Sequence, residues 1–326
     1  MKRSLSGIQP SGILHLGNYF GAMKQFVDFQ NTYEGFYFIA DYHSLTSLTN
    51  PKDLTQNTYD IVLDYLAIGL DPNKSTIFLQ SNVPEHTEMT WLLSNITPVG
   101  LLERGHSYKD KIAKGFFPNT GLLTYPILMA ADILIYDTDF VPVGKDQKQH
   151  LEMTRDIAMK FNQQYEVEFF KLPEPLILDD SAIVPGTDGQ KMSKSYGNTI
   201  NMFASKKTLK QQVMSIVTDS TPLEEPKNPD NNIAKIYALF NNIDKQNELK
   251  EKFLAGNFGY GHAKNELLES ILNHFAEARE KREKLKENMD LVHDILNEGS
   301  KKARAIAIEK VQRAKEIVGL AGNIYR

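Results

Sequence analysis

The sequence predicts an α/β protein in which a doubly wound parallel sheet is followed by a region of helices. Short apolar runs alternate with amphipathic stretches in the first part of the chain, which is the pattern of strands joined by helices. After about residue 205 the strand-like runs disappear and helical patterns remain. A length of 326 residues fits two domains better than one.

The first half opens with a strand, a helix and a second strand. Residues 4–9 have the pattern of a strand and its turn, and a helical pattern follows over 19–29. Residues 36–40 and 76–80 are short apolar runs typical of buried strands, and 54–70 between them has apolar residues at helical spacing. A strand, a helix and a strand at this spacing form a βαβ unit, so we expect the sheet to be parallel.

A second apolar block completes the first half. It covers residues 127–136 and 140–143, and a helix is expected over 146–161. Ligands of doubly wound sheets bind outside the carboxyl ends of the strands. Functional residues are therefore expected in the segments that follow the strands.

The second half is expected to be a helical domain. Its helical patterns cover residues 206–217, 233–240, 265–297 and 301–318. We place the domain boundary near residue 204, which gives domains of residues 1–204 and 205–326. The sequence leaves open whether the last helix packs back on the first domain.

Composition excludes several classes of protein. The chain has 41% hydrophobic and 24% charged residues, which are ordinary values for a globular protein. It has no apolar run of about 18 residues and no signal-peptide pattern at residues 1–7, so we expect a cytoplasmic protein without a membrane span. It has no cysteine, which excludes disulfides, cysteine-ligated metal sites and a cysteine nucleophile.

The net charge of −4 is unevenly distributed along the chain. Residues 1–204 hold 16 Lys and Arg against 23 Asp and Glu, whereas residues 205–326 hold 21 against 18. A basic region on an acidic body is consistent with a polyanionic partner. Charged helix faces that are simply solvated explain the same counts.

The densest motif is a glycine-rich turn between the first strand and the first helix. Residues 7–19 (GIQPSGILHLGNY) hold three glycines and a proline. Such a turn allows the backbone to approach a phosphate, and the helix that follows supplies N–H donors. It is not a Walker loop, because Asn18 and Tyr19 stand where Lys and Ser or Thr are needed. A purely structural turn, with His15 as a structural histidine, is the alternative.

A second motif lies at residues 186–195 (GTDGQKMSKS). Two lysines and two serines stand there in a glycine-containing loop. Lysine ammonium groups are compact charges suited to phosphate, and on a loop they can meet the charge that develops on a leaving pyrophosphate. Two lysines three residues apart are a weak signal by themselves, because most such lysines are solvated.

Together the two motifs resemble the signatures of class I aminoacyl-tRNA synthetases. Residues 15–18 (HLGN) are similar to the HIGH signature, and residues 191–195 (KMSKS) are identical to the second signature. The opening at 7–19 resembles that of bacterial-type tryptophanyl-tRNA synthetases. The resemblance continues through 122–134 (LLTYPILMAADIL) and 141–150 (VPVGKDQKQH), and so covers essentially the whole chain.

The resemblance implies a Rossmann-like catalytic domain and a reaction in two steps. ATP and L-tryptophan, with Mg²⁺, give tryptophanyl-adenylate and pyrophosphate, and the tryptophanyl group then passes to the tRNA for tryptophan. In-line displacement at the α-phosphate needs no covalent enzyme intermediate, so positioning and charge stabilisation would carry the catalysis. The resemblance further implies a homodimer and an anticodon-binding role for residues 205–326.

The resemblance also assigns residues to an ATP site. The catalytic positions of the family correspond to His15, Asn18, Lys111, Lys191 and Lys194. The positions that hold ATP correspond to Gln9, Pro10, Ser11, Gly17, Asn18, Gly144, Lys145, Asp146, Ile183, Val184, Lys191, Met192, Ser193, Lys194 and Ser195. The loop that carries the two lysines is expected to close over the pyrophosphate.

Recognition of tryptophan needs large apolar walls and one acceptor for the indole N–H. Asp132 is an acid within an otherwise apolar run, and a buried carboxylate is costly without a partner. The resemblance makes this carboxylate the acceptor, and a structural helix cap is the alternative. The resemblance also places in the pocket Gly7, His43, Tyr125, Met129, Val141, Val143 and Gln147.

Three other functions stay open. A tyrosyl-tRNA synthetase shares the fold and both signatures but needs a pocket for a phenol, and the motifs at 9–12 and 129–132 disfavour it. A catalytically silent paralogue that senses tryptophan or binds RNA need not keep both signatures. A small-molecule adenylyl- or nucleotidyltransferase needs no long helical second half. Amino-acid-dependent exchange of pyrophosphate into ATP, followed by tRNA charging, separates all four.

Overall fold

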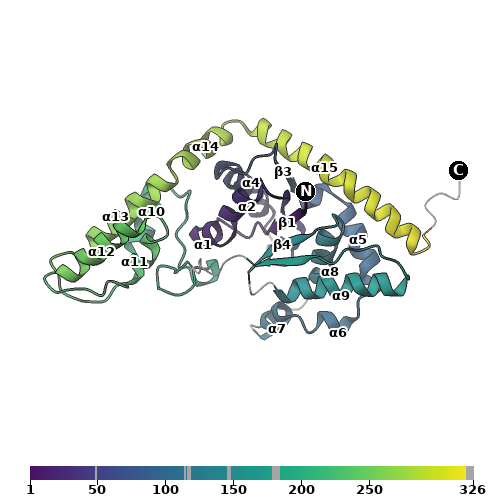
Figure 1. Ribbon diagram of the computed structural model, residues 1–326, viewed down its shortest axis with the longest axis horizontal. Coiled ribbons are helices and arrows are strands. Elements are labelled where there is room, and N and C mark those ends of the chain that lie inside the picture. The colour runs from purple at the N-terminus through teal and green to yellow at the C-terminus, as the bar shows by residue number, and fades with distance from the viewer. Residues whose placement is uncertain (48–49, 114, 116–118, 145–147, 178–183, 321–326) are drawn as a thin grey trace.

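A five-stranded parallel sheet in the order β3-β2-β1-β4-β5 forms the centre of the molecule (Figure 1). The computed structural model describes residues 1–47, 50–113, 115, 119–144, 148–177 and 184–320. The strands are β1 (Arg3–Ile8), β2 (Glu34–Ile39), β3 (Ser75–Leu79), β4 (Phe140–Val143) and β5 (Glu174–Ile177). The chain starts in the middle of the sheet, runs to one edge and then fills the other. The predicted doubly wound α/β fold is confirmed, with β5 as an additional strand.

The alternation of side chains along β2 explains why its sequence is apolar throughout. The strand pairs with β1 on one side and with β3 on the other. Tyr37 and Ile39 pack in the apolar core on one face of the sheet, and Phe36 and Phe38 pack in the core on the other face. A strand that is buried on both faces needs apolar residues at every position.

Helices surround this sheet in the first half of the chain. The described ones are α1 (Leu16–Asn18), the π-helical turn η1 (Tyr19–Met23), α2 (Lys24–Phe29), α3 (Asp41–Ser44), α4 (Pro51–Ala67), η2 (Gln80–Asn82), α5 (Glu85–Ser94), α6 (Val99–Leu102), α7 (His106–Ala113), α8 (Thr120–Leu134), α9 (Lys148–Gln164) and the short η5 (Lys194–Tyr196). The helices expected over 19–29, 54–70 and 146–161 correspond to η1 with α2, to α4 and to α9. The apolar block over 127–136 lies in α8 and the turn after it.

Polar caps fix the starts of two of the helices around the sheet. Asn50 accepts a hydrogen bond from Lys52 N at the start of α4, and Pro51 occupies the first helical position. Asn119 accepts a hydrogen bond from Leu122 N at the start of α8. An Asn cap satisfies an N–H group that has no partner within the helix, and proline suits the first turn because it lacks that group.

The second half is helical, but its helices differ from the predicted ones. They are α10 (Lys206–Met214), α11 (Asn232–Tyr237), α12 (Ile243–Ala255), α13 (Tyr260–His274), α14 (Ala276–Lys286) and α15 (Met289–Ile317). The single helix predicted over 265–297 is wrong, because the chain leaves helical geometry at Phe275 and again at Asn288. Asn288 then caps α15 by accepting from Leu291 N. The helix predicted over 301–318 is the second part of this longer helix.

The last helix packs back on the sheet, which answers the question that the sequence left open. Figure 1 shows α14 and α15 arching over the sheet domain. Gly299 of α15 lies directly on β3, where a Cβ atom would come within 1.9 Å of the carbonyl oxygen of Ile77. The small residues Ala303 and Ala307 continue this buried face of the helix.

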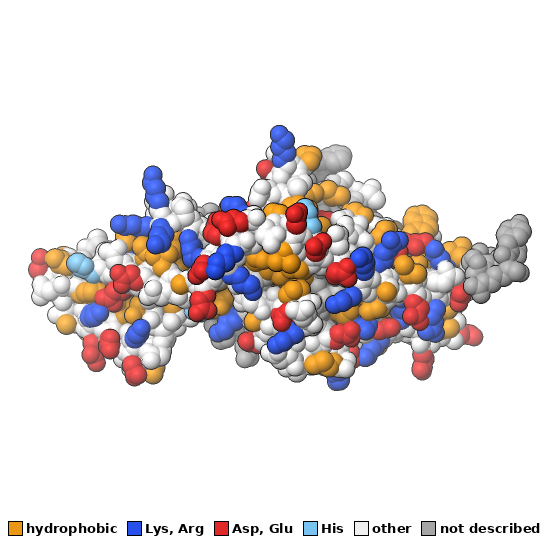
Figure 2. All heavy atoms as spheres, turned by 90° about the horizontal axis from the view of Figure 1, so that it is seen from above, with side chains coloured by type: hydrophobic (Ala, Val, Ile, Leu, Met, Phe, Trp, Pro, Cys, Tyr) orange, Lys and Arg blue, Asp and Glu red, His pale blue; other side chains and the backbone are white. Residues whose placement is uncertain are grey.

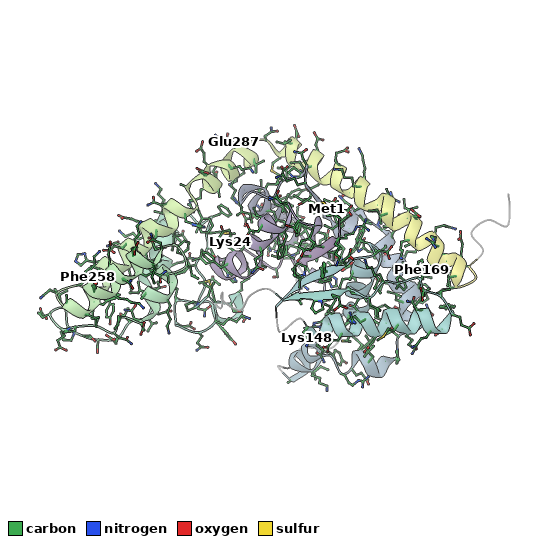
Figure 3. The ribbon with its side chains drawn as sticks, viewed as in Figure 1. Met1, Lys24, Lys148, Phe169, Phe258 and Glu287 are labelled. Carbon is green, nitrogen blue, oxygen red and sulfur yellow. The ribbon has the colours of Figure 1, made fainter. Side chains whose placement is uncertain are left out.

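Polar contacts anchor the far end of α15. The buried Lys310 ammonium group donates to the carbonyl oxygen of Phe169 at 2.9 Å and to Asp137. Phe169 is labelled near this end of the helix in Figure 3. The ring of Phe169 lies 4.0 Å from the ammonium group, which adds a cation–π contact.

The apolar core on the other face of the sheet is continuous with the helical region. Leu14 and Met23 from the first half belong to the same buried cluster as Leu249 and Leu267 from the second half. The boundary at residue 204 therefore stays a prediction.

The surface around the arch carries positive and negative side chains interspersed with apolar patches (Figure 2). Of the helices that the structure describes, none combines the length and the apolar character that crossing a bilayer requires.

Candidate active site

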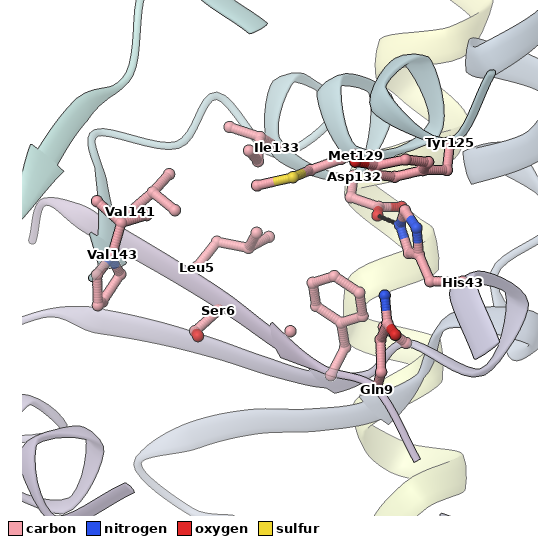
Figure 4. Close-up of a pocket in the computed structure, with 14 residues that line it drawn as sticks. Leu5, Ser6, Gln9, His43, Tyr125, Met129, Asp132, Ile133, Val141 and Val143 are labelled. Atoms are coloured by element: carbon pink, nitrogen blue, oxygen red, sulfur yellow. Dashed lines mark hydrogen bonds and ion pairs between the residues drawn. The ribbon is translucent and has the colours of Figure 1, made fainter. Parts of the chain in front are cut away.

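A cavity of about 200 Å³ opens between the ends of β1 and β2, strand β4 and helix α8 (Figure 4). This is the switch point of the sheet, where the chain order reverses between β1 and β4. The residues that line it are Leu5, Ser6, Gly7, Gln9, Phe38, Ala40, His43, Tyr125, Met129, Asp132, Ile133, Val141, Pro142 and Val143. The cavity thus brings together Gln9 and all the described residues that the sequence suggested for a tryptophan pocket.

The walls of the cavity are mostly apolar. Val141 and Val143 face it from β4, and Met129 and Ile133 face it from α8 (Figure 4). Phe38 reaches it from β2 across Gly7, where a Cβ atom would lie only 2.4 Å from the ring. A glycine at this position is therefore needed for the phenyl ring to form part of the wall.

Asp132 supplies a carboxylate at the back of the cavity. It lies inside α8, so the helix-cap alternative does not describe it, and it is almost fully buried. Its Oδ1 atom accepts from Gln80 Nε2 at 2.8 Å and is 2.5 Å from His86 Nδ1, and its Oδ2 atom is 2.8 Å from His43 Nε2. Burial by itself raises the pKa of Asp132, but the hydrogen bonds from His43 and His86 outweigh it and hold this pKa at about 2.

The hydrogen bonds leave one acceptor position on Asp132. A carboxylate offers about four lone-pair sites. Two donors occupy Oδ1 and one occupies Oδ2. The remaining lone-pair site is on Oδ2, so the cavity offers one charged acceptor among apolar walls. Such a cavity suits a ligand with a single N–H group on an aromatic ring.

Tyr125 of α8 also lines this cavity, beside Met129 and Asp132 (Figure 4). Its hydroxyl group is 2.7 Å from Nε2 of His150, a buried residue of α9. The rings of His43 and Tyr125 meet edge to face, with centroids 6.3 Å apart. A hydroxyl group beside apolar walls is suited to the charged end of an amino acid.

The glycine-rich turn and the second motif meet next to this cavity. Lys194 donates from Nζ to the carbonyl oxygen of Gly12 at 2.8 Å. Gly12 has a φ angle of +128°, a backbone conformation that residues other than glycine rarely adopt. Leu16 N also donates to the carbonyl oxygen of Ile200 at 3.0 Å, so two segments more than 180 residues apart form one structure.

His15 is buried at the start of α1. Its backbone N–H donates to Oδ1 of Asn18 at 3.1 Å. Its Nδ1 atom is buried and has no hydrogen-bond partner among the described residues. Burial, and secondarily the charge of Lys194, lowers the pKa of His15 to about 4, so the imidazole is neutral at physiological pH.

Lys194 is held as a partly buried cation. Burial lowers its pKa to about 8, against the raising influence of Asp64 on α4. The same loop also contains Ser193 and Ser195, whose hydroxyl groups are 2.9 Å apart. Met192 is buried, and its N–H donates to the carbonyl oxygen of Val184 at 2.9 Å.

The structure shows how the loop that carries Lys194 keeps its shape, which the sequence did not reveal. The buried Asn198 donates to Oδ1 of Asp188 at 2.7 Å and to the carbonyl oxygen of Lys191 at 3.1 Å. Its own Oδ1 atom accepts from Ser193 N at 2.8 Å. Asn has many ordinary roles in loops, so the local sequence did not predict this role of Asn198.

Three residues near Asp132 were also missed. Gln80 follows the end of β3, and the rule that ligand sites follow strands could have marked it. His86 stands in the first turn of α5 and Tyr136 follows α8, and neither position carries a sequence signal. Only the packing of the two helices reveals that they meet.

The remaining predicted residues are distributed around the two parts of the site. Pro10 is buried, Gln9 and Ser11 are exposed at the turn, and Lys191 and Gly144 are exposed. Gly17 and Asn18 belong to α1. Lys111 lies in α7, with its side chain outside the described part of the structure. Lys145, Asp146, Gln147 and Ile183 lie outside the described residues.

Comparisons with known proteins agree on one family. The family described as tRNA synthetases class I (W and Y) matches residues 2–276. A tryptophan–tRNA ligase of Fusobacterium nucleatum is 86% identical over 100% of both chains. The crystal structure of tryptophanyl-tRNA synthetase from Campylobacter jejuni, complexed with ADP and tryptophan, has 53% identity and a TM-score of 0.94, covering 98% of this chain and all of its own. The tryptophanyl-tRNA synthetase of Mycoplasma pneumoniae has 34% identity and a TM-score of 0.83, with both chains covered completely.

Proposed function

The chain belongs to the class I tRNA synthetases of the W and Y family, and from this membership we propose that it joins L-tryptophan to its tRNA. ATP and tryptophan first give tryptophanyl-adenylate and pyrophosphate, and the tryptophanyl group then moves to the terminal ribose of the tRNA. The observation that carries the choice of amino acid is the charged Asp132 in an apolar cavity, with one acceptor position left on Oδ2. The indole ring offers one N–H donor to it and apolar surface to the walls.

We propose that the amino acid is held at both of its ends. The indole N–H would donate to Asp132, with Met129, Val141 and Val143 against the ring. The ammonium group would lie close to the hydroxyl group of Tyr125. A tyrosine side chain also brings a donor, but on a single ring it would place this donor differently from the N–H of a fused ring.

Adenylate formation would depend on position and charge. The tryptophan carboxylate attacks the α-phosphate, the new C–O–P link forms, and the bond to pyrophosphate breaks. The neutral His15 and Asn18 would donate hydrogen bonds to phosphate oxygens at the start of α1. Lys194 would meet the negative charge that builds on the leaving pyrophosphate, where a preorganised charge lowers the barrier most.

We further propose that Mg²⁺ enters with ATP. Mg²⁺ keeps several waters and usually binds substrate phosphates with only one or two protein carboxylates. The residues near the phosphates, His15, Asn18 and Lys194, are nitrogen donors that fit phosphate oxygens rather than a cation. Bound together with ATP, the ion would neutralise part of the negative charge of the phosphates.

The test is amino-acid-dependent exchange of labelled pyrophosphate into ATP, followed by charging of tRNA. We expect exchange with L-tryptophan and hardly any with tyrosine or phenylalanine, and charging of the tRNA for tryptophan. Exchange with tyrosine instead would overturn the choice of amino acid. Binding of tryptophan without exchange would identify a silent paralogue, and exchange without charging would identify a small-molecule adenylyltransferase.

We also propose that the chain acts in the cytoplasm as a homodimer and that its basic second half binds tRNA.

A groove supports the proposed dimer interface. It lies between α3, α5 and α8 and is lined by Leu45, Thr87, Thr90 and Leu128, and Leu45 is 59% exposed. Trp91, one turn after Thr87 on α5, is 70% exposed. Large exposed apolar side chains around a groove are typical of protein interfaces.

Sedimentation equilibrium tests the dimer. We expect a dimer for the wild type and a raised dissociation constant for Trp91→Glu. The matched control is Leu254→Glu, because Leu254 is 56% exposed on α12, at the other end of the molecule. A monomeric wild type would contradict the proposal.

A further inference from the structure

A buried row of polar side chains continues behind Asp132, away from the cavity. His86 Nδ1 is 2.5 Å from Asp132 Oδ1, and His86 Nε2 is 2.7 Å from the hydroxyl group of Tyr136. Both His86 and Tyr136 are completely buried. The row links His86 of α5 to Asp132 of α8, and Asp132 is the carboxylate on which the proposed function depends.

The hydrogen-bond partners assign the protons along this row. Asp132 is ionised and can only accept, so the proton of His86 that faces it must be on Nδ1. The phenol of Tyr136 keeps its proton, because burial, with Asp132 and Glu85 as further causes, raises its pKa well above the usual value. Its O–H group has His86 Nε2 as its hydrogen-bond partner among the described residues, so Tyr136 donates to Nε2.

Aromatic packing fixes the two rings in place. The ring of Tyr136 stacks on Phe36 with centroids 5.1 Å apart. The ring centroid of His86 lies 6.0 Å from that of Phe38 and 6.2 Å from that of Phe78. The start of α5 is held in addition by Arg304 of α15, whose Nε atom is 2.9 Å from Glu85 Oε1. Neither ring can turn without disturbing the core of the sheet.

We propose that His86 and Tyr136 are positioning residues for substrate recognition: they fix Asp132 so that its Oδ2 acceptor position faces the cavity. All the hydrogen bonds run in one direction, from Tyr136 to His86 and from His86 to Asp132. The carboxylate therefore has no proton to give, and the cavity favours a ligand that donates over one that does not. The proposal rests on the proposed function, because it concerns how the amino acid is selected.

The consequence is a preference that can be measured with an isosteric substrate. In β-(3-benzothienyl)-L-alanine a sulfur atom replaces the indole N–H, so size and shape are nearly kept and the donor is lost. A site built around one donor can reject an analogue that lacks it by up to about 10⁴–10⁵-fold. We define the selectivity as kcat/KM for tryptophan divided by kcat/KM for this analogue, both from pyrophosphate exchange.

Three variants separate positioning from mere stability. Tyr136→Phe keeps the stacked ring and removes only the hydroxyl group, and we expect the selectivity to fall about 3- to 10-fold, as for the loss of one hydrogen bond. His86→Leu removes the donor to Asp132, and we expect a fall of tenfold or more. His86→Asn can place an N–H near the position of Nδ1, and we expect it to regain most of the selectivity.

Tyr65→Phe is the matched control for the same chemical change. Tyr65 is also completely buried, but it lies in α4 and packs in the core on the other face of the sheet. We expect its selectivity to equal that of the wild type. Thermal unfolding of every variant shows whether it is folded, and Tyr136→Phe keeps the test valid if His86→Leu does not fold.

The outcomes distinguish the inference from the proposed function. If Tyr136→Phe and the His86 variants lower kcat/KM for both substrates by one common factor, or change neither, the two residues are structural and the inference is overturned while the function stands. If the wild type shows no exchange with tryptophan, the proposed function fails and the inference fails with it. A fall in selectivity that His86→Asn reverses supports the inference.

Discussion

The two sides of the candidate active site are built in opposite ways. The side that we propose for tryptophan, called here the tryptophan side, is a cavity whose walls come from β1, β2, β4 and α8, and its carboxylate has three protein partners. The side that we propose for the phosphates of ATP, called here the phosphate side, consists of a turn and a loop, where Ser11, Lys191 and Ser195 are exposed and one hydrogen bond joins Lys194 to Gly12. The cavity is therefore set before a ligand arrives, whereas the phosphate side has polar groups still to be satisfied.

The difference corresponds to two different tasks. Selection between amino acids needs an acceptor at a fixed place, because a misplaced acceptor rewards the wrong ligand. Stabilisation of a leaving pyrophosphate needs positive charge that acts in the transition state and then lets the product go. The charges agree with this division: Asp132 is an anion with a pKa of about 2, and Lys194 is a cation with a pKa of about 8.

The largest effect is expected from removing the acceptor of the tryptophan side. Asp132→Ala should lower kcat/KM for tryptophan by about 30- to 5,000-fold, which is the loss of about 2–5 kcal/mol expected for one partner of a buried charged hydrogen bond. It should also narrow the gap to phenylalanine. Pyrophosphate exchange measures both, and KM for ATP should change little. Near-wild-type activation of tryptophan by this variant would make Asp132 structural and remove the main physical support for the substrate.

A smaller effect, confined to rate, is expected on the phosphate side. Lys194→Ala should slow adenylate formation by about 10²–10³-fold, the usual cost of one preorganised donor, while the Kd for tryptophan stays the same. Single-turnover kinetics give the rate, and equilibrium dialysis gives the Kd. Lys207→Ala, at an exposed lysine of α10, is the matched control. Equal rates in Lys194→Ala and the wild type would reject this role for Lys194.

The pH dependence should separate the two sides further. The active form of Lys194 is protonated, so kcat/KM for ATP, at saturating tryptophan, should fall above pH 8, by about fivefold from pH 8 to pH 9. The tryptophan side should add no change near neutral pH, because Asp132 stays ionised down to pH of about 2. Lys194→Arg should remove the alkaline fall, since arginine keeps its proton. An unchanged fall in this variant would assign it to another group.

The same contrast explains what the sequence could and could not predict. Strands β1 to β4 and the two motifs follow from local patterns, because glycine spacing and apolar runs are properties of neighbouring residues. The partners of Asp132 come from α3, from η2 after β3 and from α5, which meet only in the folded chain. Local periodicity carries no information about such contacts.

The second half shows the limit for helices. Periodicity alone extends one helix over 265–297, although Asn288 supplies a cap that starts a new helix. The helices predicted over 265–297 and 301–318 also leave a break at residues 298–300, which include Gly299. The structure keeps α15 continuous because Gly299 lets the helix lie directly on Ile77 of β3. Tertiary packing here overrides the local preference of glycine.

The smallest effect is expected at the exposed face of α15, away from both sides of the site. Lys301 is 72% exposed and pairs with Glu298 at 2.6 Å, an exposed contact of little consequence for stability. The double change Lys301→Glu and Lys302→Glu should leave pyrophosphate exchange within about twofold of the wild type, because the buried face of the helix is Gly299, Ala303 and Ala307. A rise in KM for tRNA would place RNA against this helix by loss of phosphate contacts, and an unchanged KM would leave the helix with a packing role alone. A large loss of exchange with the fold intact would contradict the prediction, since it would make this face of α15 part of the active site.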